Sequence, residues 1–255
     1  PLRAAVLGAI QGATEFLPIS SSAHLYAVPE LLGWKYEGVA FDVALHWGTL
    51  LALLAAFWHD WLGLARGALK SGPAGGTARS TLLRLAAASV PAVFAGLLLQ
   101  DEAETHLRAL PLQAVMLVVF GVLLWLVDRG RPGGRQEDVP GWSTSLLVGA
   151  AQAIALVPGV SRSGITMTAG RAAGLDRVSA ARFSFLLATP ITFGAGLLEL
   201  RHLPRDLPLA VLAAGMATSA LVGLLAIRGL LRWIGRAGFG AFCAYRVAFA
   251  AAIVA

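Results

Sequence analysis

Charged residues are scarce in this sequence. Only 13% of its 255 residues are Asp, Glu, Lys or Arg, while 57% are hydrophobic, and an ordinary soluble domain has about 25% charged residues. A soluble helical protein would place charges along the outer face of each helix, but long stretches here, such as 111–127 and 208–227, contain none. The composition therefore excludes water as the main solvent and predicts an integral membrane protein.

Cysteine is nearly absent. The single Cys243 lies in the last apolar stretch, which excludes a disulfide framework and a cysteine-based metal site. The chain begins at Pro1 without a charged start or a cleavage-type sequence, so we expect no signal peptide and insertion through the spans themselves. The formal charge of +6 would suggest nucleic acid for a soluble protein, but the basic residues here sort by loop. We therefore expect no nucleic-acid partner.

The apolar residues form long runs. A helix that crosses a membrane needs about 20 mostly apolar residues. Six stretches come near this length: 39–58, 82–99, 111–127, 183–200, 208–227 and 237–255. The sequence thus predicts an all-α polytopic protein that forms one membrane domain with six transmembrane helices.

Two polar segments repeat at an offset of about 141 residues: GAIQGATEFLPISSS at 8–22 and GAAQAIALVPGVSRS at 149–163. Each lies in an apolar region, 4–33 or 143–175, that a proline-containing turn breaks midway, and three predicted spans follow each region. Non-helical backbone inside a membrane is tolerated only where protein or water surrounds it. We therefore expect two re-entrant helix hairpins that enter from opposite faces. This is an inverted-topology repeat, with 1–110 as the first unit and 111–255 as the second.

Basic residues distinguish the two sides of the membrane. One side, with the N-terminus and the loops near 28–38, 100–110 and 201–207, carries five Lys and Arg residues, whereas the other carries thirteen. Because positively charged loops remain in the cytoplasm, we expect both termini to lie outside.

The first hairpin carries ionisable side chains in an apolar region, where such residues are costly and usually functional. Gln11 and Glu15 are four residues apart, so they share one helix face and direct two oxygens toward a metal or a substrate. Three serines at 20–22 offer hydroxyl caps for the next half-helix, and His24 can share the face of Ser21. The alternative is a serine-capped turn with a structural, hydrogen-bonded histidine.

The second hairpin has the composition of a phosphate site. Its turn at 158–159 is Pro-Gly, and Ser161, Arg162, Ser163 and Thr166 then crowd the start of a new half-helix. Backbone N–H groups at a helix N-terminus favour an anion, and a guanidinium adds a bidentate fork. The alternative is that Arg162 extends to the membrane surface, but its place directly after a helix break argues against this.

Three further ionisable residues lie within apolar stretches. Asp42 and His46 are four residues apart on one span. They either line the pocket or form a structural hydrogen-bonded pair. Arg246, near the end of the chain, is interpreted as an interhelical hydrogen-bond donor.

The motifs EFLPISSSAH at 15–24 and PGVSRSGIT at 158–166 resemble the two signature motifs of the bacterial undecaprenyl-diphosphate phosphatase family, also known for bacitracin resistance. The similarity continues through FDVALH at 41–46, FSFLLA at 183–188 and the final segment from Gly238. The resemblance implies hydrolysis of a C55 isoprenyl diphosphate to the monophosphate and inorganic phosphate. This reaction, at the outer side of the bacterial cytoplasmic (inner) membrane, would recycle the carrier lipid for peptidoglycan synthesis.

The resemblance also implies an active-site set, carried over position by position: Glu15, Ser21, His24, Ser161, Arg162, Ser163 and Thr166, with Ser20 close by. We group Gln11 and Ser20 with the substrate-binding residues. Gln11 departs from the glutamate often found there, which puts in doubt any mechanism that needs two carboxylates on this helix.

On this hypothesis Arg162 and the two helix ends grip the diphosphate, its oxygens accept hydrogen bonds from the second hairpin's hydroxyls, and His24 handles the proton. The nucleophile is either Ser21, activated by His24, or a water positioned by His24 and Glu15. The family also implies a divalent cation, Mg²⁺ or Ca²⁺, bound mainly with the substrate and with Glu15 as its protein ligand.

The chief alternative function is a secondary transporter or flippase for a phosphorylated lipid, because inverted repeats with broken helices are typical of transporters. The Ser-Arg-Ser segment would bind phosphate in either case. Membrane lipids surround the chain on both hypotheses. The Gly- and Ala-rich segments 86–97 and 213–223 can pack within the chain or in a homodimer.

Overall fold

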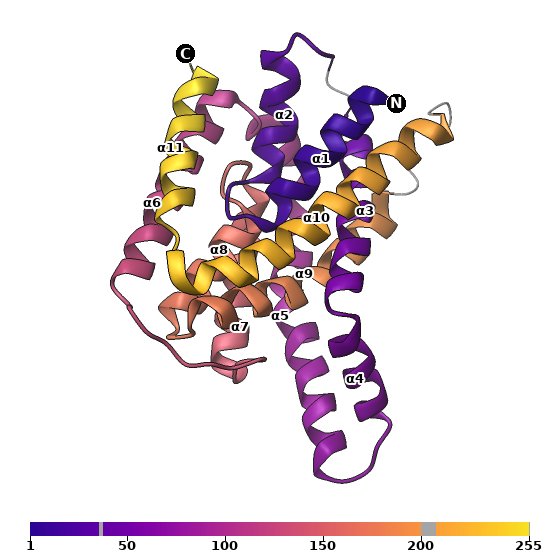
Figure 1. Ribbon diagram of the computed structural model, residues 1–255, viewed down its shortest axis with the longest axis vertical. Helices are drawn as coiled ribbons and strands as arrows, with labels where there is room; N and C mark the ends of the chain where they lie inside the picture. Colours follow the sequence, from indigo (N-terminus) through magenta and orange to yellow (C-terminus); the bar gives the residue numbers. More distant parts are fainter. Residues whose placement is uncertain (36–37, 200–207, 255) are drawn as a thin grey trace.

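All named elements of the computed structural model are helices (Figure 1). The structure describes residues 1–35, 38–199 and 208–254. In chain order the helices are α1 (Leu2–Phe16), α2 (Ser21–Leu31), α3 (Val39–Ala56), α4 (Trp58–Ala68), α5 (Pro73–His106), α6 (Leu110–Arg129), α7 (Trp142–Ala153), the 3-10 turn η1 (Ile154–Leu156), α8 (Arg162–Ala172), α9 (Arg177–Glu199), α10 (Leu209–Ala237) and α11 (Gly240–Val254). The predicted all-α class is confirmed.

Four described helices are long and apolar enough to cross a membrane: α5, α6, α9 and α10. A fifth span results if α3 and α4, which meet at a bend of 69°, count as one broken helix. The predicted span 237–255 corresponds to α11, which has only 15 residues because α10 first extends to Ala237 and Gly238 then turns the chain with a φ of 71°. Length and composition therefore support four or five of the six predicted spans.

The outer surfaces of these helices are apolar. Large hydrophobic side chains are exposed along them, among them Val90, Phe94 and Leu97 on α5, Val119 on α6 and Leu221 on α10. Apolar faces of this extent are unfavourable in water and suit contact with lipid tails. The fold is that of a multi-pass membrane protein.

Two polar turns interrupt helices where the sequence predicted breaks. The first tip, residues 17–20, separates α1 from α2, and the second tip, residues 157–161, separates η1 from α8. Ser20 and Ser161 have φ values of 73° and 74°, and no other non-glycine residue in the described chain has a positive φ. Each pairs its hydroxyl with that of the serine two positions on, at 3.2 Å. The two tips thus share one backbone geometry.

Glycines allow the first half-helix of each pair to pack closely. Helix α1 lies along α10, and α7 lies along α5. A Cβ atom on Gly8 would lie 2.2 Å from the carbonyl oxygen of Gly215, and one on Gly149 would lie 2.2 Å from that of Ala88. Small residues let helix backbones approach in membranes. At these positions the Gly- and Ala-rich segments pack within the chain.

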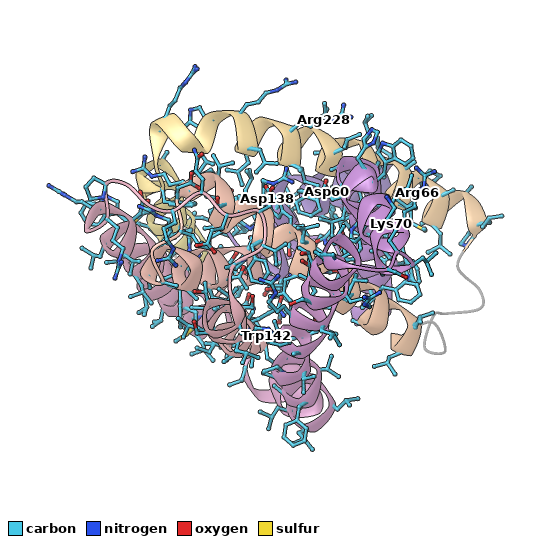
Figure 2. The ribbon with its side chains drawn as sticks, turned by 90° about the horizontal axis from the view of Figure 1, so that it is seen from below. Asp60, Arg66, Lys70, Asp138, Trp142 and Arg228 are labelled. Carbon is cyan, nitrogen blue, oxygen red and sulfur yellow. The ribbon has the colours of Figure 1, made fainter. Side chains whose placement is uncertain are left out.

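Both termini lie at one end of the molecule, and the turn between α4 and α5 lies at the other (Figure 1). Figure 2 looks onto this second end and labels Arg66 and Lys70 on the α4–α5 arm. The predicted outer loop at 201–207, with Arg201 and Arg205, lies outside the described residues.

Candidate active site

A cavity of about 310 Å³ lies where the two tips meet. Its polar wall includes Glu15 and serines 20–22 from the first hairpin and Ser161 and Arg162 from the second. The remainder comes from α3, α5, α7, η1 and α9, and it consists of small and apolar residues together with three polar side chains, His46, Gln152 and Thr192. The two hairpins therefore converge on one pocket, as the sequence predicted.

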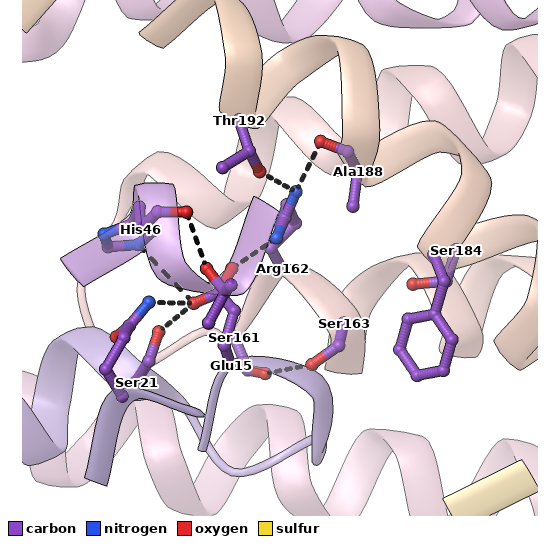
Figure 3. Close-up of polar contacts among 12 residues, drawn as sticks. Glu15, Ser21, His46, Ser161, Arg162, Ser163, Ser184, Ala188 and Thr192 are labelled. Carbon is purple, nitrogen blue, oxygen red and sulfur yellow. Dashed lines mark hydrogen bonds and ion pairs between the residues drawn. The ribbon is translucent and has the colours of Figure 1, made fainter. Parts of the chain in front are cut away.

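Glu15 is the centre of the polar wall (Figure 3). Its Oε1 atom accepts a hydrogen bond in an ion pair with Arg162, and its Oε2 atom accepts one from the hydroxyl of Ser21 at 2.5 Å. The amide of Gln11 also donates to Oε2, at 3.2 Å. Glu15 and Gln11 therefore share a helix face, as their spacing predicted, and the carboxylate joins the two hairpins.

Arg162 starts α8 directly after the second tip, and its side chain lies across the cavity wall. Besides Glu15 it donates to the carbonyl of Ala188 and the hydroxyl of Thr192, both at 3.1 Å on α9. These three acceptors fix the position of the guanidinium (Figure 3), and Arg162 lines the cavity. Its side chain is only 17% exposed, so the extended, surface-seeking alternative for Arg162 is wrong.

The serines of the two tips have different partners. The hydroxyl of Ser161 accepts a hydrogen bond from the backbone N–H of Gly164 at 3.1 Å and so caps α8. Ser163 donates to the carbonyl of Leu17 in the first tip, at 3.1 Å. The predicted serine cap of α2 is wrong: no side chain caps that helix, because Ser21 donates to Glu15 and Ser20 pairs with Ser22.

His24 and Thr166 are not among the described residues that line the cavity. Since a carbonyl oxygen only accepts, Nδ1 of His24 must donate to Ser20, at 2.8 Å, and its Nε2 then accepts from the hydroxyl of Tyr245 at 2.7 Å. Phe249 stacks on the ring at 4.0 Å. Thr166 donates to the carbonyl of Arg162 at 2.7 Å and pairs with Ser184 at 2.6 Å. In this structure both side chains support the tips from behind.

His46 is a cavity residue that the sequence left undecided. Its Nε2 lies 3.5 Å from Oε2 of Glu15, while Nδ1 donates to the backbone carbonyl of Asp42 at 2.7 Å. The four-residue spacing of Asp42 and His46 flagged the pair, but only the packing of α3 beside the first tip shows which one faces Glu15. Thr192 gave no signal in sequence, because it is one of three hydroxyl residues in an apolar span, with Ser184 and Thr189.

A divalent cation would find one carboxylate in the described cavity wall, that of Glu15. No group of three or more His, Cys, Asp or Glu side chains that could hold a metal occurs among the residues searched, which are those that the structure describes. Mg²⁺ and Ca²⁺ require about six or more oxygen ligands. The residues therefore fit a cation only if the substrate supplies most of its ligands.

These features define an all-helical, multi-pass membrane protein with a polar pocket between two broken helices. The model of the family described as "Bacitracin resistance protein BacA" matches residues 4–252. The protein is 47% identical to the Undecaprenyl-diphosphatase of Pelotomaculum thermopropionicum over 254 residues, covering 99% of this chain and 95% of that relative. It is 46% identical to the Undecaprenyl-diphosphatase of Moorella thermoacetica over 258 residues, covering 100% and 97%. The chain belongs to the BacA family.

Proposed function

We propose that this protein hydrolyses undecaprenyl diphosphate to undecaprenyl phosphate and inorganic phosphate, and thereby recycles the carrier lipid for peptidoglycan synthesis and confers bacitracin resistance. Family membership and the names of the full-length relatives support this proposal. The observation that carries it is the cluster of Arg162, Glu15 and Ser21, which joins an anion-binding group to a carboxylate–hydroxyl pair.

The binding step follows from the positions of Arg162 and the helix starts. The N-termini of α2 and α8 both reach the cavity, through Ser21 and through Ser161 with Arg162. Free N–H groups at helix starts and a guanidinium fork both favour phosphate oxygens. A diphosphate would compete with Glu15 for Arg162, while the apolar part of the cavity wall would contact the first isoprenyl units.

The chemical step follows from the contact between Ser21 and Glu15. Oγ of Ser21 would attack the terminal phosphorus while its proton passes to Oε2 of Glu15, and the bond to the bridging oxygen would break to release the lipid monophosphate. A water would then cleave the phosphoserine to inorganic phosphate. His46 lies 3.5 Å from the same carboxylate oxygen. It would therefore handle the proton, the role that the sequence analysis assigned to His24.

A divalent cation, Mg²⁺ or Ca²⁺, would bind mainly with the substrate. Glu15 would be its protein ligand, since the ion pair with Arg162 would loosen once the diphosphate attracts the guanidinium. The cation would offset the negative charge of the diphosphate.

We further propose that the chain is an inverted repeat of six spans and two re-entrant hairpins in the cytoplasmic membrane. Supporting this are the matched Ser20 and Ser161, the matched α1–α10 and α7–α5 contacts, and the pairing of α6 with α11. We take α6 and α11, which pack against each other, as the equivalent last helices of the two repeats. Helix α6 then belongs to the first repeat, and the boundary between the repeats moves from residue 110 to the segment after Arg129.

The proposed orientation puts both termini and the mouth of the cavity on the outer side. The walls from α3 and α9 support this, because Val43 and His46 lie near the start of α3 and Ala195 and Gly196 near the end of α9. These helix ends adjoin the loops with few basic residues.

The test is phosphate release from C55 and C15 isoprenyl diphosphates by the purified protein in detergent, with and without chelator. Arg162→Ala should lower the rate about a hundredfold or more, as loss of one transition-state donor does in other enzymes. Arg232→Ala, at an exposed position, is the matched control and should behave as wild type. Movement of intact lipid without any phosphate release would instead support the transporter.

A further inference from the structure

Arg246 on α11 is a fully buried arginine outside the cavity wall. Its guanidinium donates to backbone carbonyls of both tips: to Pro18 at 3.2 Å, to Gly159 at 2.8 Å and to Val160 at 3.1 Å. Further donations go to carbonyls of α6, among them Leu117 at 2.7 Å. One side chain therefore joins both tips to the helix pair α6–α11.

Arg246 donates to backbone carbonyls and, in the described part of the chain, to no carboxylate. Among the residues that the structure describes, no carboxylate forms an ion pair with it. A buried cation in a membrane is costly, and apolar side chains of similar volume are often at least as stabilising as buried charges. General stability therefore does not explain an arginine at this position.

Two glycines leave room for the side chain of Arg246. A Cβ atom on Gly121 of α6 would lie 3.1 Å from both Cδ and Nε of Arg246, and one on Gly164 of α8 would lie 3.1 Å from its Nη1 atom. Gly164 belongs to the Ser-Arg-Ser-Gly segment of the second hairpin. The guanidinium thus lies against α8 at Gly164, two residues after Arg162, which lines the cavity.

The tip carbonyls that Arg246 binds lie beyond the C-terminal ends of α1 and η1. A helix C-terminus carries a partial negative charge, which would weaken the attraction of an anion to the same tip. The guanidinium offsets this negative charge at both tips together. The helix starts of α2 and α8, with Arg162, then dominate the field in the cavity.

We propose that Arg246 is a positioning residue for the diphosphate site: it fixes the spacing of the two tips and cancels the negative ends of their first half-helices. It acts through the carbonyls of Pro18, Gly159 and Val160 and does not touch the substrate. Tyr245 strengthens the same attachment, since its hydroxyl donates to His24 on α2. The inference rests on the proposed phosphatase function.

The experiment compares Arg246→Lys and Arg246→Met with Arg171→Lys. Arg171 is the matched control because it is also fully buried and donates to backbone carbonyls, but at Gly133 and Leu175, away from the tips. For each variant, kcat for phosphate release, the affinity for inorganic pyrophosphate measured by thermal shift, and the melting temperature would be determined.

Lysine keeps the charge but lacks the planar fork that reaches several carbonyls. Arg246→Lys should therefore bind pyrophosphate within about threefold of wild type while kcat falls about tenfold or more. Arg246→Met should also lose about tenfold in pyrophosphate affinity, since compensating each helix end is worth a factor of a few. Arg171→Lys should lower the melting temperature and leave both kcat and pyrophosphate affinity unchanged.

The proposal requires kcat to fall in Arg246→Lys and to stay unchanged in Arg171→Lys. Equal kcat values for the two variants would overturn it. If the substitutions at Arg246 prevent folding, Gly121→Ala decides, because its Cβ meets only Arg246 among its three nearest atoms and should lower kcat without unfolding the chain. If wild type releases no phosphate at all, the proposed function fails, yet pyrophosphate affinity still tests Arg246 by itself.

Discussion

Gly12 provides a sharp test of the close contact between α1 and α10. A Cβ atom at this position would lie 2.5 Å from the carbonyl oxygen of Ser219 and 2.7 Å from the backbone nitrogen of Gly223. Both atoms belong to the backbone of a long helix, so Gly12→Ala must push the two helices apart. Overpacking of this kind costs about 1–3 kcal/mol, which for a chain of this size lowers the melting temperature by about 2–12 °C.

At Gly63 we expect the same substitution, glycine to alanine, to change the melting temperature in the opposite direction. It lies inside α4, and no atom lies within 4 Å of the Cβ that it would gain. Alanine is about 0.5–1 kcal/mol more favourable than glycine in a helix interior, so Gly63→Ala should raise the melting temperature slightly.

Thermal unfolding in detergent, followed by the fluorescence of the seven tryptophans, measures both variants. Glu15 follows Gly12 by three residues, so Gly12→Ala should also lower phosphate release below its melting temperature. A Gly12→Ala protein that melted at or above the wild-type temperature would refute the close contact of α1 with α10.

Two further predictions concern a buried ion pair and the nucleophile. Asp128 accepts hydrogen bonds from Arg171 at 2.9 Å and Arg177 at 2.8 Å, so Asp128→Asn should cost about 3–5 kcal/mol of stability in the same melting assay. Loss of less than about 1 kcal/mol, the usual value for an exposed pair, would contradict this. Ser21→Ala should abolish both phosphate release and labelling of the protein by a substrate with ³²P in the terminal phosphate, whereas Ser22→Ala should keep both. Full hydrolysis by Ser21→Ala would assign the attack to water.

The two tips could be predicted because local chemistry determines them. Proline ends a helix, serine and glycine suit the turn that follows, and an arginine after a helix break has few partners other than anions and carboxylates. Glu15 and Arg162 were therefore expected in one pocket, and the structure joins them in an ion pair.

The positions of three other ionisable side chains depend on partners that are distant in the sequence. His24 was expected beside Ser21 because of its spacing, but Tyr245, 221 residues away, holds its ring outside the cavity. His46 faces Glu15 only because α3 packs beside the first tip. Arg246 was expected as an interhelical hydrogen-bond donor, which is confirmed, yet its contact with both tips could not be read from spacing.

A substitution at Gln11 tests whether a second carboxylate lets this pocket hold a cation without substrate. Its amide nitrogen donates to Glu15, and its buried Oε1 has no hydrogen-bond partner among the described residues. Gln11→Glu would place a second carboxylate beside the first, so the two would repel each other in chelator and bind a divalent cation together.

The expected result is a variant whose melting temperature falls in chelator and recovers when Mg²⁺ or Ca²⁺ is added. Cation at ten times its Kd adds about 1.4 kcal/mol of stability, or roughly 3–6 °C for a chain of this size. Wild type, with Glu15 as the one carboxylate in the described cavity wall, should show no such shift until a prenyl diphosphate is added. A wild-type protein that cations stabilise without substrate would contradict this reasoning, because the pocket would then hold metal with neither a second carboxylate nor the phosphates of a substrate.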